Sequence, residues 1–542
     1  MEERYTDIRL VKVPIELDNK NQLTFASKTA QYTYFNGCTH IEVDDSSYQR
    51  KDNTIRYPGH IDDLIGYNYC MYKNTSYSSK WFYAFITDMR YINDSMTLVT
   101  IKTDVWQTWQ FDIEIKKCFV EREHVNSDNY AEHTVPENLE TGEYITAYSV
   151  DSTDLGSSHV VMATTISPSD GTTAVTGGLY GGIYSGVKYY VFDTLTDLNN
   201  ALNRIASNGN SDSIVSIFYC PDWISGYSTG SFDSNGIKEV PQNAGVNKAS
   251  GISIPLHPTV IDGYTPKNKK LFTYPYVSYL LSNNEGNSIS YRIEDFLQEA
   301  DQLGNYTGDL HLYGTCTPGG SIRIIPKYYK VKDKLLNQEY NNEYGLNAAK
   351  FPIASWGNDS YTNWLTQTGI NVGGVKIDGA TVAIGKGVVN TAVGAGTIAM
   401  TGGAMGGFET GQGIGQIFNA IQEVYHHSFN PVQATGNINS GDVTYSLGKL
   451  TFTGYFMTIK SEYAKIIDEY FSTFGYKVNR MKIPNITGRT NWNYVKTIEC
   501  NIHAFIPQVD CLEIKNMFNA GVTFWHNPST FLDYSQTNSI VS

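Results

Sequence analysis

Alternating apolar and polar side chains predict consecutive strands in the first 125 residues of the chain. The alternation is clear at residues 8–13 and 81–86. Residues 96–103 resume it after the turn-forming sequence Asn93-Asp94-Ser95, so we expect a hairpin there. Residues 118–125 are expected to return as a further strand.

A short helix is predicted between these strands, beginning after Asp104. Aspartate is a favoured N-cap because its carboxylate accepts hydrogen bonds from the free N–H groups of the first helical turn. The residues available for the buried stripe of this helix are Val105, Trp106, Trp109 and Ile113.

The composition changes from about residue 145 to residue 300, where Ser, Gly, Asp and Asn dominate. Short β-type runs such as residues 187–192 occur there, and residues 194–206 have the spacing of a helix, with Leu195, Leu198, Leu202 and Ile205 on one side. We interpret this region as an insertion or a second domain. Further strands are predicted at residues 321–325 and 328–331.

After residue 437 the sequence predicts a regular order of strands and helices. A strand at 449–460 leads into a helix that Ser461 caps, that continues through Phe471 and that ends at Gly475. Strands at 476–482 and 493–503, a helix at 510–519 and a strand at 522–526 follow. This β-α-β-β-α-β order is the split βαβ pattern.

These patterns indicate a β-rich α+β fold with several domains, as a length of 542 residues also favours. The N- and C-terminal strands are expected to pack together around an inserted middle region and a long hydrophobic loop. The expected segments are 1–145, an inserted domain at 146–300, a lower β region at 301–365, the loop at 366–436 and the C-terminal part at 437–542.

The loop contains the most unusual stretch of the sequence. Residues 369–418 include fifteen glycines and four charged side chains, and residues 387–408 carry no charge at all. As a helix this uncharged run would span about 33 Å, close to the hydrocarbon thickness of a bilayer. The apolar residues in and after it are Val388, Val389, Val393, Ile398, Met400, Met405, Phe408, Ile417 and Phe418. Because Gly, Ala and Thr separate these apolar residues, insertion of the segment into a membrane would be only marginally favourable. Marginal insertion suits a segment that a soluble protein exposes only when it is needed.

Small residues recur in this stretch at every fourth position. In a helix this spacing forms one small-residue face along which neighbouring helices approach closely in lipid. The positions are Gly379, Ala383, Gly387, Thr391, Ala395, Ala399, Gly403, Gly407, Gly411 and Gly415. The pattern therefore predicts a membrane-inserting segment with a helix–helix contact face.

Two other interpretations of the stretch remain. A flexible glycine-rich linker is one, although linkers usually use Ser and polar residues where this segment has Val, Ile, Met and Ala. Residues 394–399 also match GxGxxA, but no clear preceding strand places them in a dinucleotide-binding βαβ unit.

Charge and cysteine content limit the class of protein. The net charge of −14 excludes a protein that works by neutralising phosphates, yet it suits a conduit past which DNA must slide. The seven cysteines are odd in number, lack a CxxC pair and are interpreted as mostly buried thiols of a protein folded in a reducing cytoplasm. The polar N-terminus predicts that no secretory signal peptide is present.

No group of residues predicts catalysis. Residues 226–230 match GxSxG but are followed by turn-forming residues, which favours a surface loop. Glu121 and Glu123 share one face of a predicted strand, where salt-bridged carboxylates are commoner than acid–base pairs. His426-His427 alone predicts no metal site, and the alternating Lys330, Lys332 and Lys334 indicate a solvated strand edge. We therefore expect no enzyme activity, no metal and no cofactor.

Several strings of the sequence are informative beyond their periodicity. In the N-terminal part they are WFYAF at 81–85, DVWQTWQFDI at 104–113 and REHV at 122–125. In the C-terminal part they are GYKVNR at 475–480, PN at 484–485, NYV at 493–495 and GVTFWH at 521–526. These strings strongly resemble the tail knob (distal tail tube) proteins of phi29-like short-tailed bacteriophages. The resemblance covers residues 1–125 and 440–530, with little that matches in 145–360.

The resemblance implies a virion protein at the distal end of the tail, made in the host cytoplasm. Such proteins form a hexameric tube through which genomic DNA leaves, and a long hydrophobic loop before the C-terminal strands plugs the tube and later forms a pore in the host membrane. Residues 369–418 occupy the matching place. The implied partners are further copies of the chain, a lower collar protein, a tip-associated hydrolase, the host membrane and passing DNA, which is not read by sequence.

Two other functions compete with a tail tube. A host-receptor or glycan-binding adhesin would use the Tyr- and Trp-rich surface of residues 145–360 and would lack membrane activity. A tail-associated cell-wall hydrolase would need a catalytic constellation that the sequence does not offer.

Overall fold

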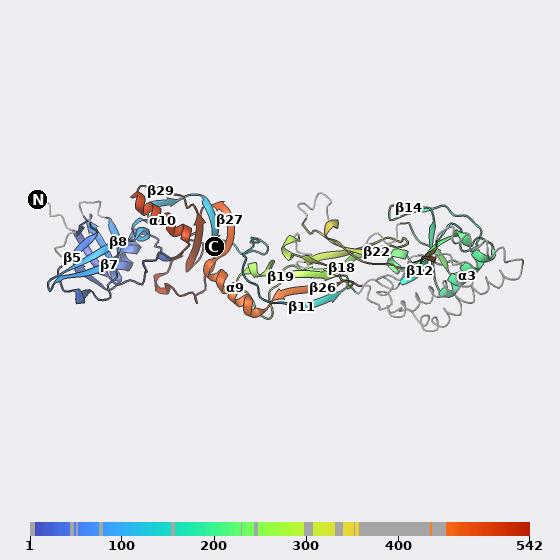
Figure 1. Cartoon of the computed structure of the whole chain (residues 1–542), viewed down its shortest axis with the longest axis horizontal. Coiled ribbons are helices and arrows are strands. Elements are labelled where there is room, and N and C mark those ends of the chain that lie inside the picture. The colour runs from blue at the N-terminus through green and yellow to red at the C-terminus, as the bar shows by residue number, and fades with distance from the viewer. Residues whose placement is uncertain are drawn as a thin grey trace. The chain divides into compact units, whose positions relative to one another are not determined.

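The computed structural model describes residues 6–43, 48–49, 52–74, 80–152, 158–228, 230–242, 248–296, 307–330, 340–351, 353–356, 434–435 and 451–541. The chain forms two compact units, and each combines segments that are distant in sequence (Figure 1). Unit 1 comprises Met1–Gly142, Thr259–Pro275 and Lys460–Ser542. Unit 2 comprises Glu143–Pro258 and Tyr276–Ile459.

The N-terminal part of unit 1 is a seven-stranded sheet. Its strands, in spatial order, are β3 (His40–Val43), β1 (Thr6–Val11), β6 (Tyr69–Asn74), β7 (Trp81–Asn93), β8 (Met96–Thr103), β5 (Thr54–Tyr57) and β4 (Tyr48–Gln49). The predicted hairpin is confirmed, since Asn93 lies opposite Met96. Both faces are buried, because Tyr69 and Met71 of β6 join one apolar cluster and Cys70 and Tyr72 join another.

Two helices accompany this sheet. Helix α1 (Lys28–Gly37) is capped by Ser27, and α2 (Val105–Trp109) is capped by Asp104, whose carboxylate accepts from the N–H of Gln107 at 3.0 Å. The predicted cap is thus confirmed. The predicted stripe is wrong at Ile113, because α2 ends at Trp109 and Ile113 begins strand β9 (Ile113–Ile115).

A five-stranded sheet joins the two ends of the chain within unit 1. Its order is β2 (Asn21–Leu23), β30 (Val522–Trp525), β28 (Trp492–Ile498), β10 (Cys118–Glu123) and β27 (Tyr476–Lys482). The expectation that N- and C-terminal strands pack together is confirmed by these pairings. Helix α10 (Gln508–Ala520) packs against this sheet through Ile514, Met517 and Phe518.

The predicted split βαβ arrangement does not form. Strand β26 (Thr453–Ile459) pairs in unit 2, in a sheet of order β11 (Tyr144–Asp151), β26, β19 (Val277–Ser282) and β20 (Ser288–Tyr291). In unit 1, β10 lies between β27 and β28. The single strand expected at 493–503 is divided into β28 and β29 (Ile502–Ala504), because Glu499 adopts a φ of 56° that breaks the extended chain.

The two ends of helix α9 (Ser461–Phe474) are fixed by different contacts. The prediction that Ser461 caps this helix is wrong, because Ser461 is its first residue. The N–H of Ser461 donates to Asp262 Oδ2 at 2.9 Å, so a carboxylate from a distant segment caps the helix. Gly475 ends α9 as predicted, with a φ of 65° and its N–H bonded to the carbonyl of Phe471.

Unit 2 holds two further large sheets. One has the order β17 (Ile237–Glu239), β15 (Lys188–Phe192), β12 (Ser158–Thr164), β16 (Ile214–Pro221), β24 (Ile353–Trp356) and β25 (Ala434–Thr435). The other has the order β18 (Lys248–Pro255), β21 (Thr307–Gly314), β22 (Ser321–Pro326) and β23 (Leu346–Lys350).

Shorter elements complete both units. Helix α3 (Leu195–Ser207) confirms the predicted helix and begins with a capping box of Thr194 and Asp197. The strand expected at 328–331 is absent from its described residues, because Tyr328 and Lys330 have φ values of 59° and 53°. The remaining elements are α4 (Asp222–Ser225), hairpin β13 (Gly178–Tyr180) and β14 (Ile183–Ser185), and 3-10 helices Ile61–Leu64, Ser211–Ser213, Lys269–Phe272, Ile293–Asp295, Asn342–Tyr344 and Pro528–Thr530.

Candidate functional site: the anchored loop and the buried polar cluster of unit 1

The predicted membrane-inserting residues, from Gly379 to Phe418, lie outside the described part of the chain. The backbone on both sides of them is described. Strand β24 precedes the loop and β25 follows it, and the two pair antiparallel, with Ser355 opposite Thr435 and Trp356 opposite Ala434. Residues 357–433 therefore leave and rejoin the fold at directly adjacent positions.

The loop is attached to the edge of a well-packed sheet. β24 also pairs with β16, with Phe218 opposite Ile353 and Ser216 opposite Ser355. β16 is a central strand whose Phe218 and Ile217 are buried. Directly paired residues of antiparallel strands have Cα atoms about 4.5–5.5 Å apart, so the two ends of the loop lie side by side in one sheet.

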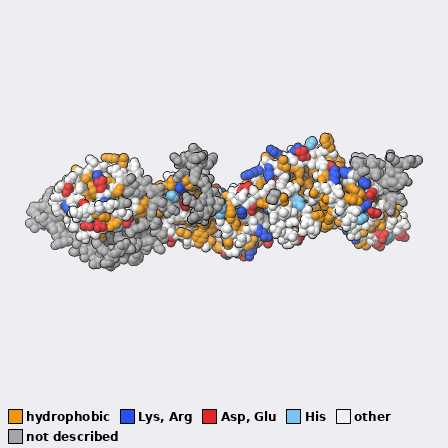
Figure 2. Space-filling view, turned by 180° about the vertical axis from the view of Figure 1, so that it is seen from behind, with side chains coloured by type: hydrophobic (Ala, Val, Ile, Leu, Met, Phe, Trp, Pro, Cys, Tyr) orange, Lys and Arg blue, Asp and Glu red, His pale blue; other side chains and the backbone are white. Residues whose placement is uncertain are grey.

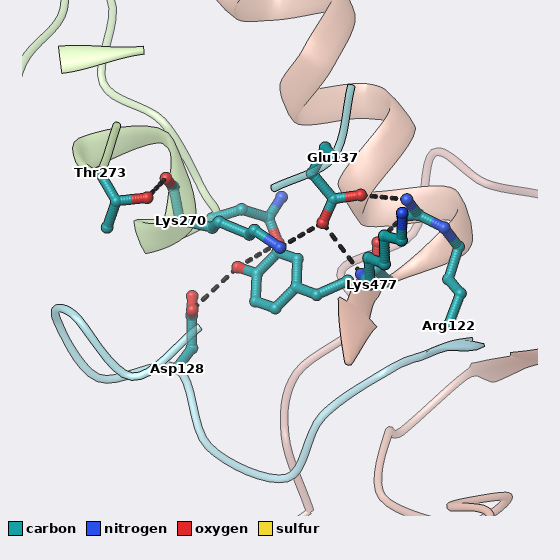
Figure 3. Close-up of polar contacts among 9 residues, drawn as sticks. Arg122, Asp128, Glu137, Lys270, Thr273 and Lys477 are labelled. Atoms are coloured by element: carbon teal, nitrogen blue, oxygen red, sulfur yellow. Dashed lines mark hydrogen bonds and ion pairs between the residues drawn. The ribbon is translucent and has the colours of Figure 1, made fainter. Parts of the chain in front are cut away.

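A buried polar cluster lies in unit 1, centred on Glu137 (Figure 3). One carboxylate oxygen of Glu137 pairs with Arg122 of β10 and the other with Lys270 of the segment 259–275. The N–H of Lys477 in β27 donates to the same carboxylate at 2.9 Å. The Glu137 side chain is only 1% exposed. One carboxylate thus holds together three parts of unit 1 that are distant in sequence.

Further carboxylates bind the segment 259–275 within the same unit. Asp128 accepts from the Tyr476 hydroxyl at 2.8 Å and from the N–H of Lys269 at 3.0 Å. Asp468 of α9 accepts from the backbone and side chain of Asn268 at 3.0 and 2.8 Å. Burial raises the pKa of Tyr476 well above its usual value, so its hydroxyl remains a proton donor.

Burial also affects the cations of the cluster. It lowers the pKa of Lys270, while the neighbouring carboxylate of Glu137 opposes that shift. Arg122 also donates to the carbonyl of Gly475 at 2.7 Å and lies 4.8 Å from the ring centroid of Tyr470. Because both oxygens of Glu137 are occupied by fixed donors, the cluster stabilises the unit and offers no free acid or base for catalysis.

His124 forms a second buried contact at the end of β10. Its Nδ1 accepts from the N–H of Tyr494 at 2.8 Å, so Nε2 carries the proton and donates to the carbonyl of Ser472 at 3.1 Å. Burial, followed by the charge of Arg489, lowers the pKa of His124 to about 3. Protonation of Nδ1 would set two N–H groups against each other, so the bonding geometry favours the neutral ring.

The structure also describes several residues that were weighed as possible catalytic or surface sites. Glu121 pairs with Lys496 at 2.9 Å and the buried Glu123 pairs with Lys482, which confirms salt-bridged carboxylates there. Ser228, the serine of the GxSxG match, is exposed in a turn after α4. The Nζ atom of Lys330 lies 3.6 Å from Oδ2 of Asp295, so the two side chains form an ion pair.

His426, His427, Lys332, Lys334 and residues 394–399 lie outside the described residues. Within the described ranges, no group of His, Cys, Asp and Glu side chains is arranged to hold a metal ion. The cysteines are free and mostly buried, as predicted.

The helices that the structure describes include none long and apolar enough to cross a membrane. Hydrophobic side chains do reach the surface among charged and polar ones (Figure 2). The sequence did not predict the organising role of Glu137, Asp128 and Asp468. Acidic residues in a segment without predicted elements look like ordinary loop residues, and no spacing pattern indicates their burial.

The chain matches two protein-family profiles. A family profile described as "Bacillus phage phi29, Tail knob protein gp9, C-terminal domain" matches residues 240–539. Another, described as "Caudoviral major tail protein N-terminus", matches residues 4–116.

Individual relatives are similar over nearly their full length. Tail knob protein gp9 of Bacillus phage PZA is 26% identical over 585 aligned residues, covering 96% of each chain. Tail knob protein gp9 of Bacillus phage phi29 is 25% identical over 614 aligned residues, covering 99% of this chain and 98% of the relative. The structure of the bacteriophage C1 tail knob protein, gp12, aligns with a TM-score of 0.63 at 15% identity, covering 99% of this chain and 100% of that one, so the two share a fold.

Proposed function

Because this chain belongs to the family of the phi29 tail knob protein gp9, we propose that it forms the hexameric distal tube of a short phage tail. The chain is a structural protein of a phage tail, as its relatives are. In the proposal, DNA leaves through the tube, and residues 366–436 of each copy plug the channel and then penetrate the host membrane. A lower collar protein and a tip-associated hydrolase are its proposed neighbours in the tail.

The pairing of β24 with β25 is the observation that supports a releasable loop. Both ends of residues 357–433 are fixed within one sheet, so the loop can change its position without unfolding the sheet that carries it. The segment between them has the uncharged run and the period-four small residues expected of a segment that inserts and associates.

The charge of the chain supports a conduit. A net charge of −14 makes strong phosphate binding unfavourable, so DNA can pass without being held.

Replacing the loop tests the proposal directly. Because Trp356 and Ala434 are directly opposed, a two-residue Asn-Gly turn can connect them and replace residues 357–433. We expect this variant to assemble like the unaltered protein but to release no dye from anionic liposomes, at neutral pH or in acid. Equal dye release by the variant would refute the membrane role of the loop.

Two point variants separate insertion from association. Ile398→Asp places a charge within the uncharged run, at a cost of about 2.5–3.5 kcal/mol for a central position, and is expected to suppress insertion. Gly403→Leu makes the segment more apolar but removes a small residue from the contact face. The Gly403→Leu variant is expected to bind liposomes as strongly as the unaltered chain does but to release less dye from them. If both variants released as much dye from liposomes as the unaltered chain, the proposed mode of insertion would be contradicted.

A further inference from the structure

Hairpin β13–β14 of unit 2 carries large apolar side chains beside its turn. Leu179 is 51% exposed, Ile183 is 57% exposed and Tyr184 is 72% exposed. The turn is Gly181-Gly182, and a Cβ added to Gly182 would meet none of the described atoms within 4 Å, so the turn projects away from the described part of the unit. We call Leu179, Ile183 and Tyr184 the hairpin tip.

The apolar surface of the hairpin tip continues from one face of the hairpin to the other. Leu179 is directly opposite Tyr184, so these two side chains share one face. On the other face Tyr180 is directly opposite Ile183. Tyr180 is buried, and its ring centroid lies 4.5 Å from that of Tyr189 in β15, whereas Ile183 reaches water. A narrow tip that is apolar on both faces fits a medium that surrounds it better than it fits a flat partner.

The sequence around the hairpin tip carries no charge. Residues 171–187 contain no Asp, Glu, Lys, Arg or His. At the two borders of this run, Lys188 is paired with Glu239 at 2.8 Å, and Asp170 accepts from the hydroxyl of Thr173 at 2.6 Å. A partner that binds through charge therefore finds little to recognise at the tip. Tyrosine beside Leu, Ile and Gly is instead typical of the boundary between membrane and water, where an apolar ring with a polar hydroxyl is favoured.

The hairpin lies at the same end of its sheet as the exit of residues 357–433. Strand β24 is antiparallel to β16, so the chain leaves β24 at the end of the sheet where β16 begins. At this end Ile214 of β16 is paired with Thr164 of β12, and Thr164 is paired with Lys188, the first residue of β15. Since β14 ends two residues before β15 begins, the hairpin is at this end too.

Backbone contacts hold the hairpin there. The N–H of Gly181 donates to the carbonyl of Gln242 at 3.0 Å, and the side-chain oxygen of Gln242 accepts from the N–H of Leu179 at 3.4 Å. Gln242 follows β17, which is antiparallel to β15 and therefore ends where β15 begins. A membrane that receives residues 357–433 consequently faces the hairpin tip as well.

We propose that the hairpin tip binds the surface of the lipid bilayer that residues 357–433 enter, at the boundary between headgroups and acyl chains. A two-stranded hairpin cannot pair all of its backbone N–H and C=O groups, so it is excluded from the hydrocarbon core. The contact is therefore shallow, about 5–10 Å deep, and forms no pore. This inference rests on the proposed membrane role of the loop and adds a surface that seats unit 2 on the bilayer.

A second hairpin, in unit 1, offers a matched control. Beside the turn of hairpin β7–β8, Tyr91 and Ile92 are 47% and 48% exposed. Residues 88–94 around them include two Asp and one Arg, so the same two residue types stand among charges there. The hairpin variant is Ile183→Ser with Tyr184→Ser, and the control variant is Tyr91→Ser with Ile92→Ser.

Both variants are made in the intact chain and in a loop-free chain, in which Asn-Gly replaces residues 357–433. Circular dichroism first shows that each variant keeps the melting temperature of its parent chain. Binding to phosphatidylcholine vesicles is then measured by flotation at neutral pH, and dye release is measured with the same vesicles. The loop-free chain separates the contact of the hairpin from the insertion of the loop.

We expect the loop-free chain to float with the vesicles and to release no dye. Its hairpin variant should bind at least about 10-fold more weakly, because two apolar side chains lose their contact with lipid, and its control variant should bind as the parent does. Binding should change little between about 50 and about 500 mM salt, since the hairpin tip has no charge for salt to screen. In the intact chain, the hairpin variant should need more protein for the same dye release.

Several results would overturn the inference. A loop-free chain that does not bind vesicles would reject the hairpin contact, while dye release by the intact chain would still support the loop. Equal binding by the hairpin and control variants would also reject it. A hairpin variant that binds vesicles normally but does not join phage tails would show that the tip binds another tail protein. If the intact chain releases no dye but the loop-free chain binds through the hairpin, the loop proposal fails and the hairpin contact stands.

Discussion

Replacing Glu137 by glutamine removes the one negative charge at the centre of the polar cluster in unit 1. The change keeps the shape of the side chain but leaves Arg122 and Lys270, which are 9% and 2% exposed, without their shared counter-ion. Breaking a buried ion pair by removing one partner costs about 3–5 kcal/mol, because the remaining charge stays out of water. We expect a loss of unfolding free energy in this range for unit 1.

Urea unfolding followed by tryptophan fluorescence measures this loss, since Trp106, Trp492 and Trp525 are all buried in unit 1. With a urea m-value of about 3 kcal/mol/M, the midpoint should fall by roughly 1–1.7 M. Asp18→Asn is the control, because Asp18 and its partner Lys20 are exposed and such pairs contribute under about 1 kcal/mol.

A double variant tests whether an uncompensated charge causes the loss. Adding Lys270→Met to Glu137→Gln removes one of the two buried cations, so the double variant should lose less stability than the sum of the single variants. A Glu137→Gln midpoint within about 0.3 M of the unaltered chain, equivalent to about 1 kcal/mol, would refute the assignment of this cluster as the link between the segments of unit 1.

Three further changes have defined outcomes. The pKa of His124 is about 3 in the folded chain against 6.5 ordinarily, so the stability that the neutral ring contributes is complete above pH 6.5 and is lost as the pH falls toward 3. His124→Gln should therefore flatten the fall in melting temperature between pH 7 and pH 5. Burial raises the pKa of Asp104 from 3.8 to about 6, so this group adds stability as the pH falls from 6 to 4, and Asp104→Asn should steepen the same acid-induced fall. Gly475→Ala should lower the unfolding midpoint of unit 1, because its φ is 65° and a Cβ there would lie 2.2 Å from the carbonyl oxygen of Glu123; an unchanged midpoint would contradict the geometry at this helix end.

Local signals in the sequence predicted the local structure well. Alternation located β7 and β8, Asp104 marked the start of α2, and Gly475 marked the end of α9, because each depends on a few neighbouring side chains. The resemblance to tail knob proteins rested mainly on strings in β7, β10, β27, β28 and β30, which lie in the sheets of unit 1, and on the string that includes α2.

These local signals could not predict which distant segments of the chain pair with one another. The strand order of β10 between β27 and β28 depends on contacts across most of the chain, and the capping of α9 depends on Asp262, far away in sequence. The left-handed residues Glu499, Tyr328 and Lys330 interrupt runs whose composition favours strands. The patterns that marked Gly379–Phe418 predict affinity for a membrane, while the pairing of Trp356 with Ala434 depends on the fold.

That pairing limits how the loop can be threaded. As long as Trp356 and Ala434 remain partners, residues 357–433 start and finish on the same side of any barrier that they meet. A chain with this constraint crosses a bilayer an even number of times, so each uncharged run such as 387–408 needs a returning segment. A pore built from such loops would contain outgoing and returning segments in equal number, contributed in pairs by every subunit.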